Sequence, residues 1–126
     1  MTVYYCDGSG WNGERAGFAV VNNDTGTVSK KTFREKTTNN EAEYLAVIHA
    51  LSLCANGDVV FTDSQLVVNQ CKREEIGRWK VNEPRLRELQ GLVLAALAEK
   101  PDVELLWVAR SENVAGIVME NEKKRA

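Results

Sequence analysis

The stretch NEAEYLAVIHALSLCANGDVVFTDS, residues 40–64, decides the fold. Asn40 to Cys54 lacks Gly and Pro and is rich in Ala, Leu and Glu, which predicts a helix that ends before Asn56-Gly57. Asp58 to Thr62 follows with a short apolar run that predicts a buried strand. A helix that leads directly into a buried strand indicates an α/β arrangement.

The segments before this stretch predict an antiparallel meander. Three runs have a composition that favours strands: Thr2–Cys6, Ala16–Asn22 and Thr27–Phe33. The first run ends at Asp7-Gly8-Ser9-Gly10, which predicts a turn. Residues 22–26 predict a hairpin loop, because Asn, Asp and Gly favour tight turns.

The segments after this stretch alternate between helix and strand. In chain order they are a short helix capped by Asp63-Ser64 and ending near Gln70, a charged connection Lys72–Asn82, a long helix Arg85–Lys100 opened by Pro84, a strand Val103–Val108, and a final helix capped by Ser111. A hairpin followed by alternating helices and strands predicts a mixed sheet that is covered on both faces by helices.

Length and composition favour one domain that covers residues 1–126. No apolar run reaches the roughly 20 residues of a membrane helix, and Met1 to Cys6 does not have the pattern of a signal peptide. The three cysteines have no C-x-x-C spacing, so we expect free buried thiols in a reducing compartment, the cytoplasm. Without a coiled-coil stripe we expect a monomer, and the net charge of −2 is not that of a general nucleic-acid binder.

Acidic residues stand where two of the predicted strands end. Asp7 follows the first strand, and Asp63 follows the strand that ends at Thr62. Both strands are too apolar for a solvated edge, so we expect them to be central neighbours whose aspartates lie close together. Either aspartate alone could instead form a turn or cap a helix.

A helix supplies the third carboxylate of this cluster. Glu41 and Glu43 lie about 200° apart around a helix, so only one can face the aspartates, and periodicity does not choose between them. Carboxylates that converge repel one another unless a cation neutralises them. Oxygen-rich clusters suit Mg²⁺ or Mn²⁺, so the residues predict a divalent-metal site.

Four motifs resemble those of type 1 ribonuclease H, in the same order and at the same spacing. They are Tyr5–Ser9, Thr38–Tyr44, Thr62–Gln65 and Trp107–Asn113. The resemblance implies the ribonuclease H-like fold, a mixed five-stranded sheet flanked by helices on both faces. It also implies that Asp7, Glu43 and Asp63 are catalytic and hold two Mg²⁺ or Mn²⁺ ions. The implied reaction is hydrolysis of the RNA strand of an RNA–DNA hybrid, which leaves 5′ phosphate and 3′ hydroxyl ends.

The fourth carboxylate of that family has no counterpart in this chain. The family places an Asp about five residues after the Glu of a Glu-Asn pair, and counting from Glu112 reaches Ile117, or Gly116 with a one-residue deletion. We expect Asn113 to be the fourth catalytic residue and metal ligand, with Glu112 and Glu120 as alternatives. Asn113 could instead be a helix-start or loop residue. A neutral ligand there should favour Mn²⁺ over Mg²⁺. The loss also leaves open a hybrid-binding module with impaired catalysis.

Residues around the predicted metal site are the expected substrate contacts. They are Gly8, Ser9, Gly10, Asn12, Thr38, Asn39, Asn40, Gln65, Trp79 and Arg110. Thr38 and Asn39 match the family's phosphate pocket for the DNA strand, and Trp79 lies among basic residues that can follow a phosphate backbone. Each could instead be a cap, a turn or part of a solvated connection. A junction resolvase is a weaker interpretation, because the segments around Asn39-Asn40 and Thr62–Gln65 favour the hybrid-cutting branch of the fold. An actin-like ATPase is weaker too, since a single domain lacks the second lobe that such an ATPase needs.

Overall fold

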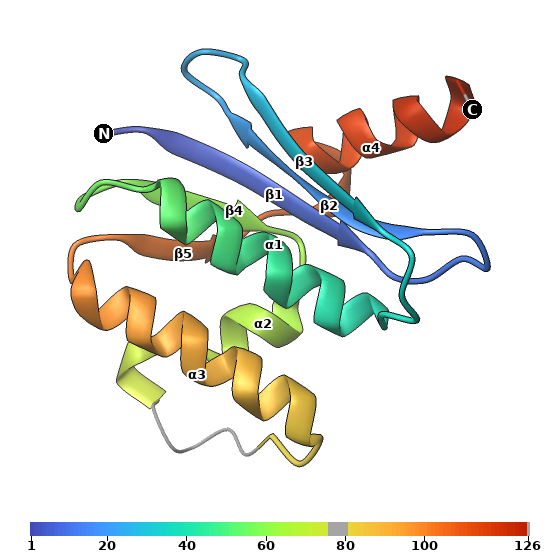
Figure 1. The fold of residues 1–126 in the computed structure, drawn as a ribbon. Coiled ribbons are helices and arrows are strands. Elements are labelled where there is room, and N and C mark those ends of the chain that lie inside the picture. The colour runs from blue at the N-terminus through green and yellow to red at the C-terminus, as the bar shows by residue number, and fades with distance from the viewer. Residues whose placement is uncertain (76–80, 126) are drawn as a thin grey trace.

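The computed structural model describes residues 1–75 and 81–125, and it has an α/β architecture (Figure 1). The strands are β1 Val3–Ser9, β2 Ala16–Asn22, β3 Val28–Phe33, β4 Val59–Thr62 and β5 Glu104–Trp107. The helices are α1 Asn39–Leu53, α2 Gln65–Gln70, α3 Pro84–Glu99 and α4 Val114–Arg125, with short 3₁₀ turns η1 Arg73–Glu75 and η2 Arg110–Glu112. Among the described residues, no helix is both long and apolar enough to cross a membrane.

The five strands form one mixed sheet in the order β3-β2-β1-β4-β5. β2 pairs antiparallel with β1 and with β3, whereas β4 pairs parallel with β1 and with β5. β1 is therefore the central strand, and β4 lies beside it with β5 on its other side. The prediction that the two aspartate-bearing strands are central neighbours is confirmed.

Helices cover both faces of this sheet. α1 packs against β1, β2 and β4, and α3 packs on the outside of α1, while α4 contacts β1 and β2 (Figure 1). Neighbouring residues of a strand point to opposite faces. Gly8 faces the backbone of α1, and Asp7 lies next to Gly116 of α4, so α1 and α4 lie on opposite faces. This confirms the predicted arrangement.

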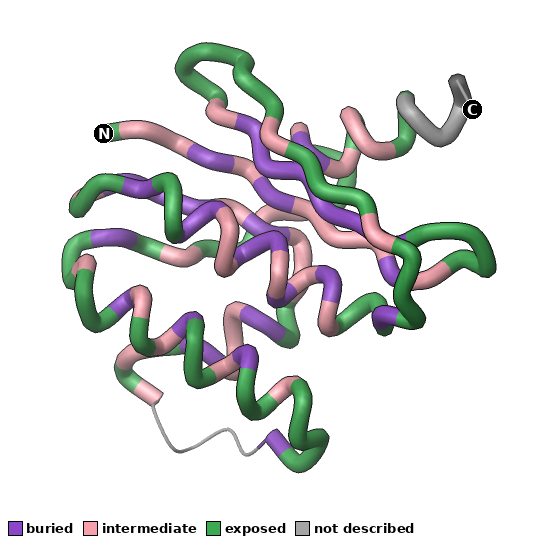
Figure 2. The backbone as a smooth tube through the Cα atoms, viewed as in Figure 1, coloured by how far each residue is buried: buried purple, intermediate pink, exposed green. Residues whose placement is uncertain are grey.

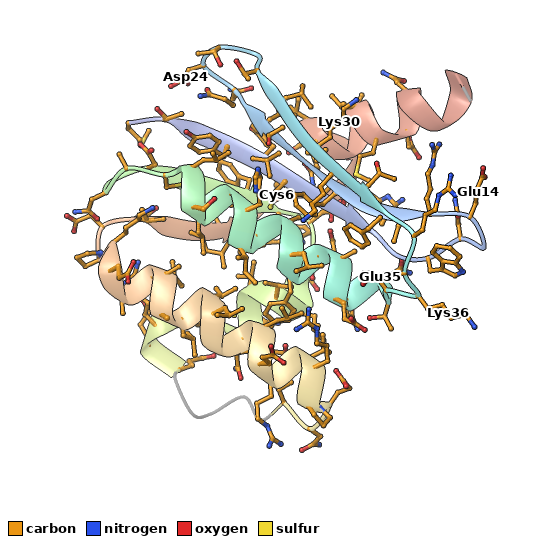
Figure 3. The ribbon with its side chains drawn as sticks, in the orientation of Figure 1. Cys6, Glu14, Asp24, Lys30, Glu35 and Lys36 are labelled. Carbon is orange, nitrogen blue, oxygen red and sulfur yellow. The ribbon has the colours of Figure 1, made fainter. Side chains whose placement is uncertain are left out.

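The main core lies between the sheet, α1 and α3 (Figure 2). Its fully buried side chains include Tyr44, Leu51, Val60, Leu89 and Val93. All three cysteines are free thiols and buried, as the sequence predicted, and Cys6 lies beneath α1 (Figure 3). α1 begins where the Thr38 hydroxyl accepts a hydrogen bond from the Glu41 N–H, which caps the helix.

Two predicted boundaries are wrong, both near the site. β1 continues to Ser9, so the predicted turn at residues 7–10 is mainly strand. β2 supplies the reason, because it pairs with β1 through Ser9, beyond the point where β4 ends. The final helix begins at Val114 and is not capped by Ser111, which lies in η2. The Asn113 side chain accepts from the Ala115 N–H and so caps α4.

Candidate active site

An open pocket of ≈ 570 Å³ lies at the end of the sheet where the parallel pairing of β1 and β4 stops. Cys6 pairs with Thr62, so the next residues, Asp7 within β1 and Asp63 just after β4, lie at the same level. The N-terminal half of α1, the loop before α4 and the first turns of α4 supply the rest of the lining.

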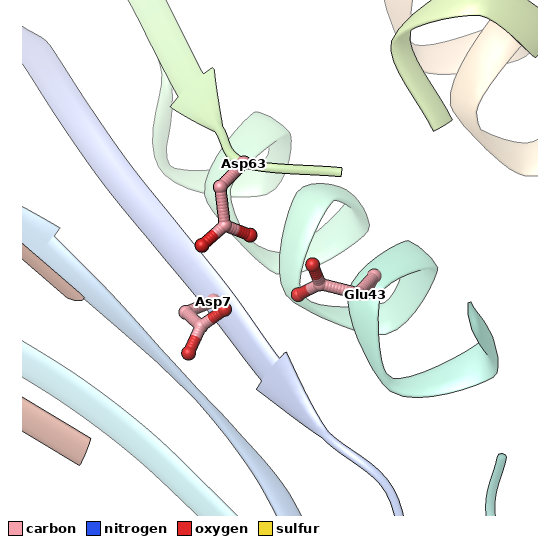
Figure 4. A group of neighbouring side chains, drawn as sticks. All are labelled: Asp7, Glu43 and Asp63. Carbon is pink, nitrogen blue, oxygen red and sulfur yellow. The ribbon is translucent and has the colours of Figure 1, made fainter. Parts of the chain in front are cut away.

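Three carboxylates converge in this pocket: Asp7 from β1, Asp63 from the end of β4 and Glu43 from α1 (Figure 4). One oxygen from each lies within 4.8 Å of those from the other two. The structure thus brings together the three acidic residues that the sequence analysis placed in one cluster. This spacing is close enough for one cation to contact all three groups.

The choice between the two glutamates of α1 is clear from their contacts. The Gly8 N–H donates to Oε1 of Glu43, which fixes that carboxylate beside β1. Glu41 points elsewhere: its carboxylate accepts from the Thr38 hydroxyl and lies 3.9 Å from the Arg85 guanidinium. Glu41 therefore serves the start of α1 and its contact with α3.

Two glycines let β1 and the loop after it approach α1 this closely. A Cβ on Gly8 would overlap the backbone of Ala42 and Glu43, and one on Gly10 would overlap Asn39. The Gly10 N–H also donates to Oδ1 of Asn39 at 2.8 Å. Both positions therefore require glycine because of close backbone approach.

The charge of the cluster perturbs its own protonation. Burial, and then the neighbouring Asp7 carboxylate, raise the pKa of Glu43 from 4.5 to about 9, and a hydrogen bond with Asp63 adds to this. Complete burial, and then the same acidic groups, raise the pKa of the Cys6 thiol beneath them. Among the described residues that line the pocket, Arg110 is the one basic side chain. A divalent cation would relieve this repulsion, so the residues fit a metal site.

Of the two positions expected to carry a fourth carboxylate, Ile117 and Gly116, both line the pocket, and Gly116 lies next to Asp7. A Cβ built on Gly116 would lie 3.5 Å from Oδ2 of Asp7, whereas Ile117 is 47% exposed. The Asn113 amide is fully buried: its Nδ2 donates to the Cys6 carbonyl at 2.9 Å and its Oδ1 accepts from Ala115. These contacts argue against the prediction that Asn113 is a metal ligand, because they use its amide to tie α4 to β1.

The expected substrate contacts divide into two groups. Gly8, Ser9, Asn39, Asn40 and Arg110 line the pocket. The others do not line it: Gly10 is buried against Asn39, Thr38 caps α1, Asn12 accepts from the backbone of Glu14 and Arg15, and Gln65 is exposed at the start of α2. Trp79 lies outside the described residues.

Sequence reasoning missed three lining residues, Ser64, Ser111 and Met119. Met119 lies three positions after Gly116 and Glu120 lies four after it, so helical spacing from Gly116 points to both. The sequence analysis named Glu120 as an alternative ligand but not Met119, and it placed the cap of this helix two residues early, at Ser111 instead of Asn113.

Several known proteins are similar to this chain in sequence. The family described as RNase H matches residues 1–123. Bifunctional protein Rv2228c of Mycobacterium tuberculosis is 33% identical over 114 residues, which are 84% of this chain and 30% of that protein. The uncharacterized protein Mb2253c of Mycobacterium bovis matches to the same extent. The chain thus spans about 30% of the length of these curated relatives.

Solved structures agree over nearly the full length of the chain. The N-terminal RNase H domain of Rv2228c, solved as a fusion with maltose binding protein, has 31% identity and a TM-score of 0.73, with 99% of this chain and 98% of that chain covered. RNase H1 from Halobacterium salinarum has 27% identity and a TM-score of 0.75 with the same coverage. LC11-RNase H1 in complex with an RNA/DNA hybrid has 25% identity and a TM-score of 0.67, and both chains are covered completely.

Proposed function

The chain belongs to the RNase H family, and from this premise we propose that it is a metal-dependent endonuclease that hydrolyses the RNA strand of RNA–DNA hybrids. The observation that carries the proposal is the convergence of Asp7, Glu43 and Asp63 at the end of the parallel strands. A similar RNase H1 was solved with an RNA/DNA hybrid bound, which supports the same substrate class here. The expected products carry 5′ phosphate and 3′ hydroxyl ends.

The three carboxylates are the proposed ligands of Mg²⁺ or Mn²⁺. When bound, two such ions would supply activation of the attacking water and stabilisation of the leaving 3′ oxygen. The protein's part is to hold the oxygens in place. The Gly8 N–H fixes Glu43, and Asn113 fixes the carbonyl of Cys6, the residue next to Asp7. These contacts preorganise the cluster before substrate arrives.

Residues along the same pocket are the proposed contacts to the hybrid. Ser9, Asn39 and Asn40 offer hydrogen-bonding groups, which can recognise the 2′-hydroxyls that distinguish RNA from DNA. Arg110 offers a positive charge for a phosphate next to the carboxylates. We propose that one domain of residues 1–126 carries this activity as a monomer, and a cytoplasmic location stays a prediction.

A hybrid-binding module with impaired catalysis is the alternative. Ile117 and Gly116 favour it, because neither of these two expected positions of the family's fourth carboxylate carries a ligand atom. One experiment distinguishes the nuclease from the hybrid-binding module.

The test is cleavage of an end-labelled RNA–DNA hybrid in Mg²⁺ and in Mn²⁺, with Asp7→Asn as the matched variant. A nuclease should produce fragments of the RNA strand, and these fragments should disappear in Asp7→Asn. A protein that binds the hybrid but cuts in neither metal would exclude the nuclease and leave the binding module.

A further inference from the structure

Gly116 leaves an open space on the wall of the metal site. A Cβ there would meet Oδ2 of Asp7 at 3.5 Å and the Asn113 Cβ at 3.8 Å, which are ordinary contact distances. Packing therefore does not require glycine at this position, unlike Gly8 and Gly10. Glycine also lowers helix stability relative to alanine. Glycine at position 116 leaves the α4 surface beside Asp7 without a side chain.

Glu120 lies one helical turn beyond this space, on the same face of α4. It is exposed, and it lines the same pocket as Asp7, Glu43, Asp63 and Gly116. Side chains of an α-helix lean toward the N-terminus, so a residue at i+4 covers the surface over residue i. With hydrogen alone at residue 116, the long side chain of Glu120 can extend over Gly116 toward Asp7.

We propose that Glu120 is the fourth carboxylate ligand of the metal site and reaches it across Gly116. This inference rests on the proposed function, since it assigns a ligand to the same site. It means that the fourth ligand has moved by one turn of α4 and gained one methylene of length. The fourth ligand is then negatively charged, not neutral as expected from Asn113.

Other candidates near the start of α4 fit this role less well. Asn113 uses its amide in two hydrogen bonds within the fold, and Ile117 carries no ligand atom. Glu112 is exposed in η2 and is not among the residues that line the pocket. Glu112 therefore provides a matched control, because Glu112→Gln removes the same charge from the same end of the molecule.

The test measures Mn²⁺ binding to the metal-free protein. Electron paramagnetic resonance detects the free Mn²⁺, and calorimetry measures the same binding independently. Glu120→Gln should weaken the affinity by about tenfold or more, a loss that even outer-shell partners of a metal cause. Glu120→Asp should weaken it as well, because the shorter side chain keeps the charge but loses the reach. Glu112→Gln should bind as the wild type does.

A rescue variant separates ligation from misfolding. In Gly116→Asp combined with Glu120→Gln, a carboxylate stands directly beside Asp7, so Mn²⁺ affinity should recover. Wild-type Mn²⁺ affinity in both Glu120→Gln and Glu120→Asp, together with loss of binding in Asp7→Asn, would overturn this inference but not the proposed function. Retained affinity in Glu120→Asp with a loss in Glu120→Gln would also overturn it, in favour of a long-range charge effect. A wild type that binds no Mn²⁺ would overturn the proposed function together with the inference.

Discussion

Glu43 makes the metal-free protein sensitive to pH. Its pKa is raised from 4.5 to about 9, so the folded state keeps a proton that the unfolded chain has already released in this range. Stability therefore falls as pH rises from about 5 to 9, because the native state then binds more protons than the unfolded state. Asp7→Asn removes the neighbouring charge and should reduce this loss.

Thermal unfolding in EDTA between pH 5.5 and 8.5 measures this effect. We expect Asp7→Asn to melt higher than the wild type at pH 8 by about 3–5 °C, a difference on the order of 1 kcal/mol that shrinks toward pH 5.5. Millimolar Mn²⁺ should raise the melting temperature of the wild type and leave that of the variant nearly unchanged. Melting temperatures that stay equal across the range would show that the carboxylates do not interact in this way.

At the residue scale, the sequence predicts which acidic residues lie together better than it predicts which way a single side chain points. Asp7 and Asp63 could be paired because strand ends of adjacent parallel strands share one edge of the sheet. The residue pattern alone could not show that Glu43 faces the aspartates and Glu41 does not. That choice depends on how closely β1 approaches α1 where Gly8 meets Ala42, and these two residues are far apart in the sequence. The sequence left open whether Asn113 is a metal ligand or a helix-start residue, and its role as a cap became clear only with the start of α4.

At the scale of the elements, Arg73 joins η1 to the end of α3. Its guanidinium donates to three carbonyls, those of Leu97 at 2.6 Å, Lys100 at 3.0 Å and Val103 at 2.7 Å. Carbonyls at the end of a helix have no partners within the helix, so a charged donor there stabilises both the helix and the turn that follows.

Arg73→Ala should lower the free energy of unfolding by about 2–3 kcal/mol, since these carbonyls would lose a charged donor. Urea titration followed by circular dichroism measures the change. Lys72→Ala, one residue earlier and exposed, should stay within about 0.5 kcal/mol of the wild type. Equal effects of the two substitutions would contradict a specific role for Arg73.

Gly91 in the middle of α3 offers a stabilising change. A Cβ at this position has no heavy atom within 4 Å, and the residue is exposed. Gly91→Ala should therefore raise the free energy of unfolding by about 0.5–1 kcal/mol through helix propensity alone. Gly57 has a φ of +94°, so Gly57→Ala should destabilise instead. The same urea titration compares them, and a shared sign for the two variants would refute the argument.

Element order could be predicted from the sequence because each helix and strand carries its own apolar period and its own breaker. The end of β1 could not, because Asp7, Gly8 and Ser9 have the composition of a turn and are held as a strand by pairing with β2. Tertiary pairing overrides local preference at this point, and it places Asp7 within a strand rather than on a loop.

At the scale of the whole molecule, the site joins segments from both faces of the sheet. Glu43 comes from α1 on one face and Gly116 from α4 on the other, and both meet Asp7 at the end of the central strand. The layered fold could be predicted from the sequence. The position of α4 relative to the carboxylates could not, since it depends on the buried hydrogen bond from Asn113 to Cys6.

The net charge of −2 means that hybrid binding depends on where the basic residues lie. Arg110 is exposed and lines the carboxylate pocket, whereas Lys72 lines a different pocket near η1. If Arg110 neutralises one phosphate, Arg110→Ala should weaken binding of all hybrid sequences to a similar degree. It should also reduce the slope of log affinity against log salt concentration by about 1.

Fluorescence anisotropy of a labelled hybrid over a range of salt concentrations measures that slope. Arg110→Ala and Lys72→Ala are compared in the Asp7→Asn background, so that the RNA strand stays intact during the titration. Lys72→Ala should leave the slope unchanged, because its charge lies away from the pocket. A slope that falls equally in both variants would mean that the protein attracts the hybrid through its overall field. A slope reduced only in Arg110→Ala would place one phosphate of the hybrid beside the three carboxylates, where the proposed reaction needs it.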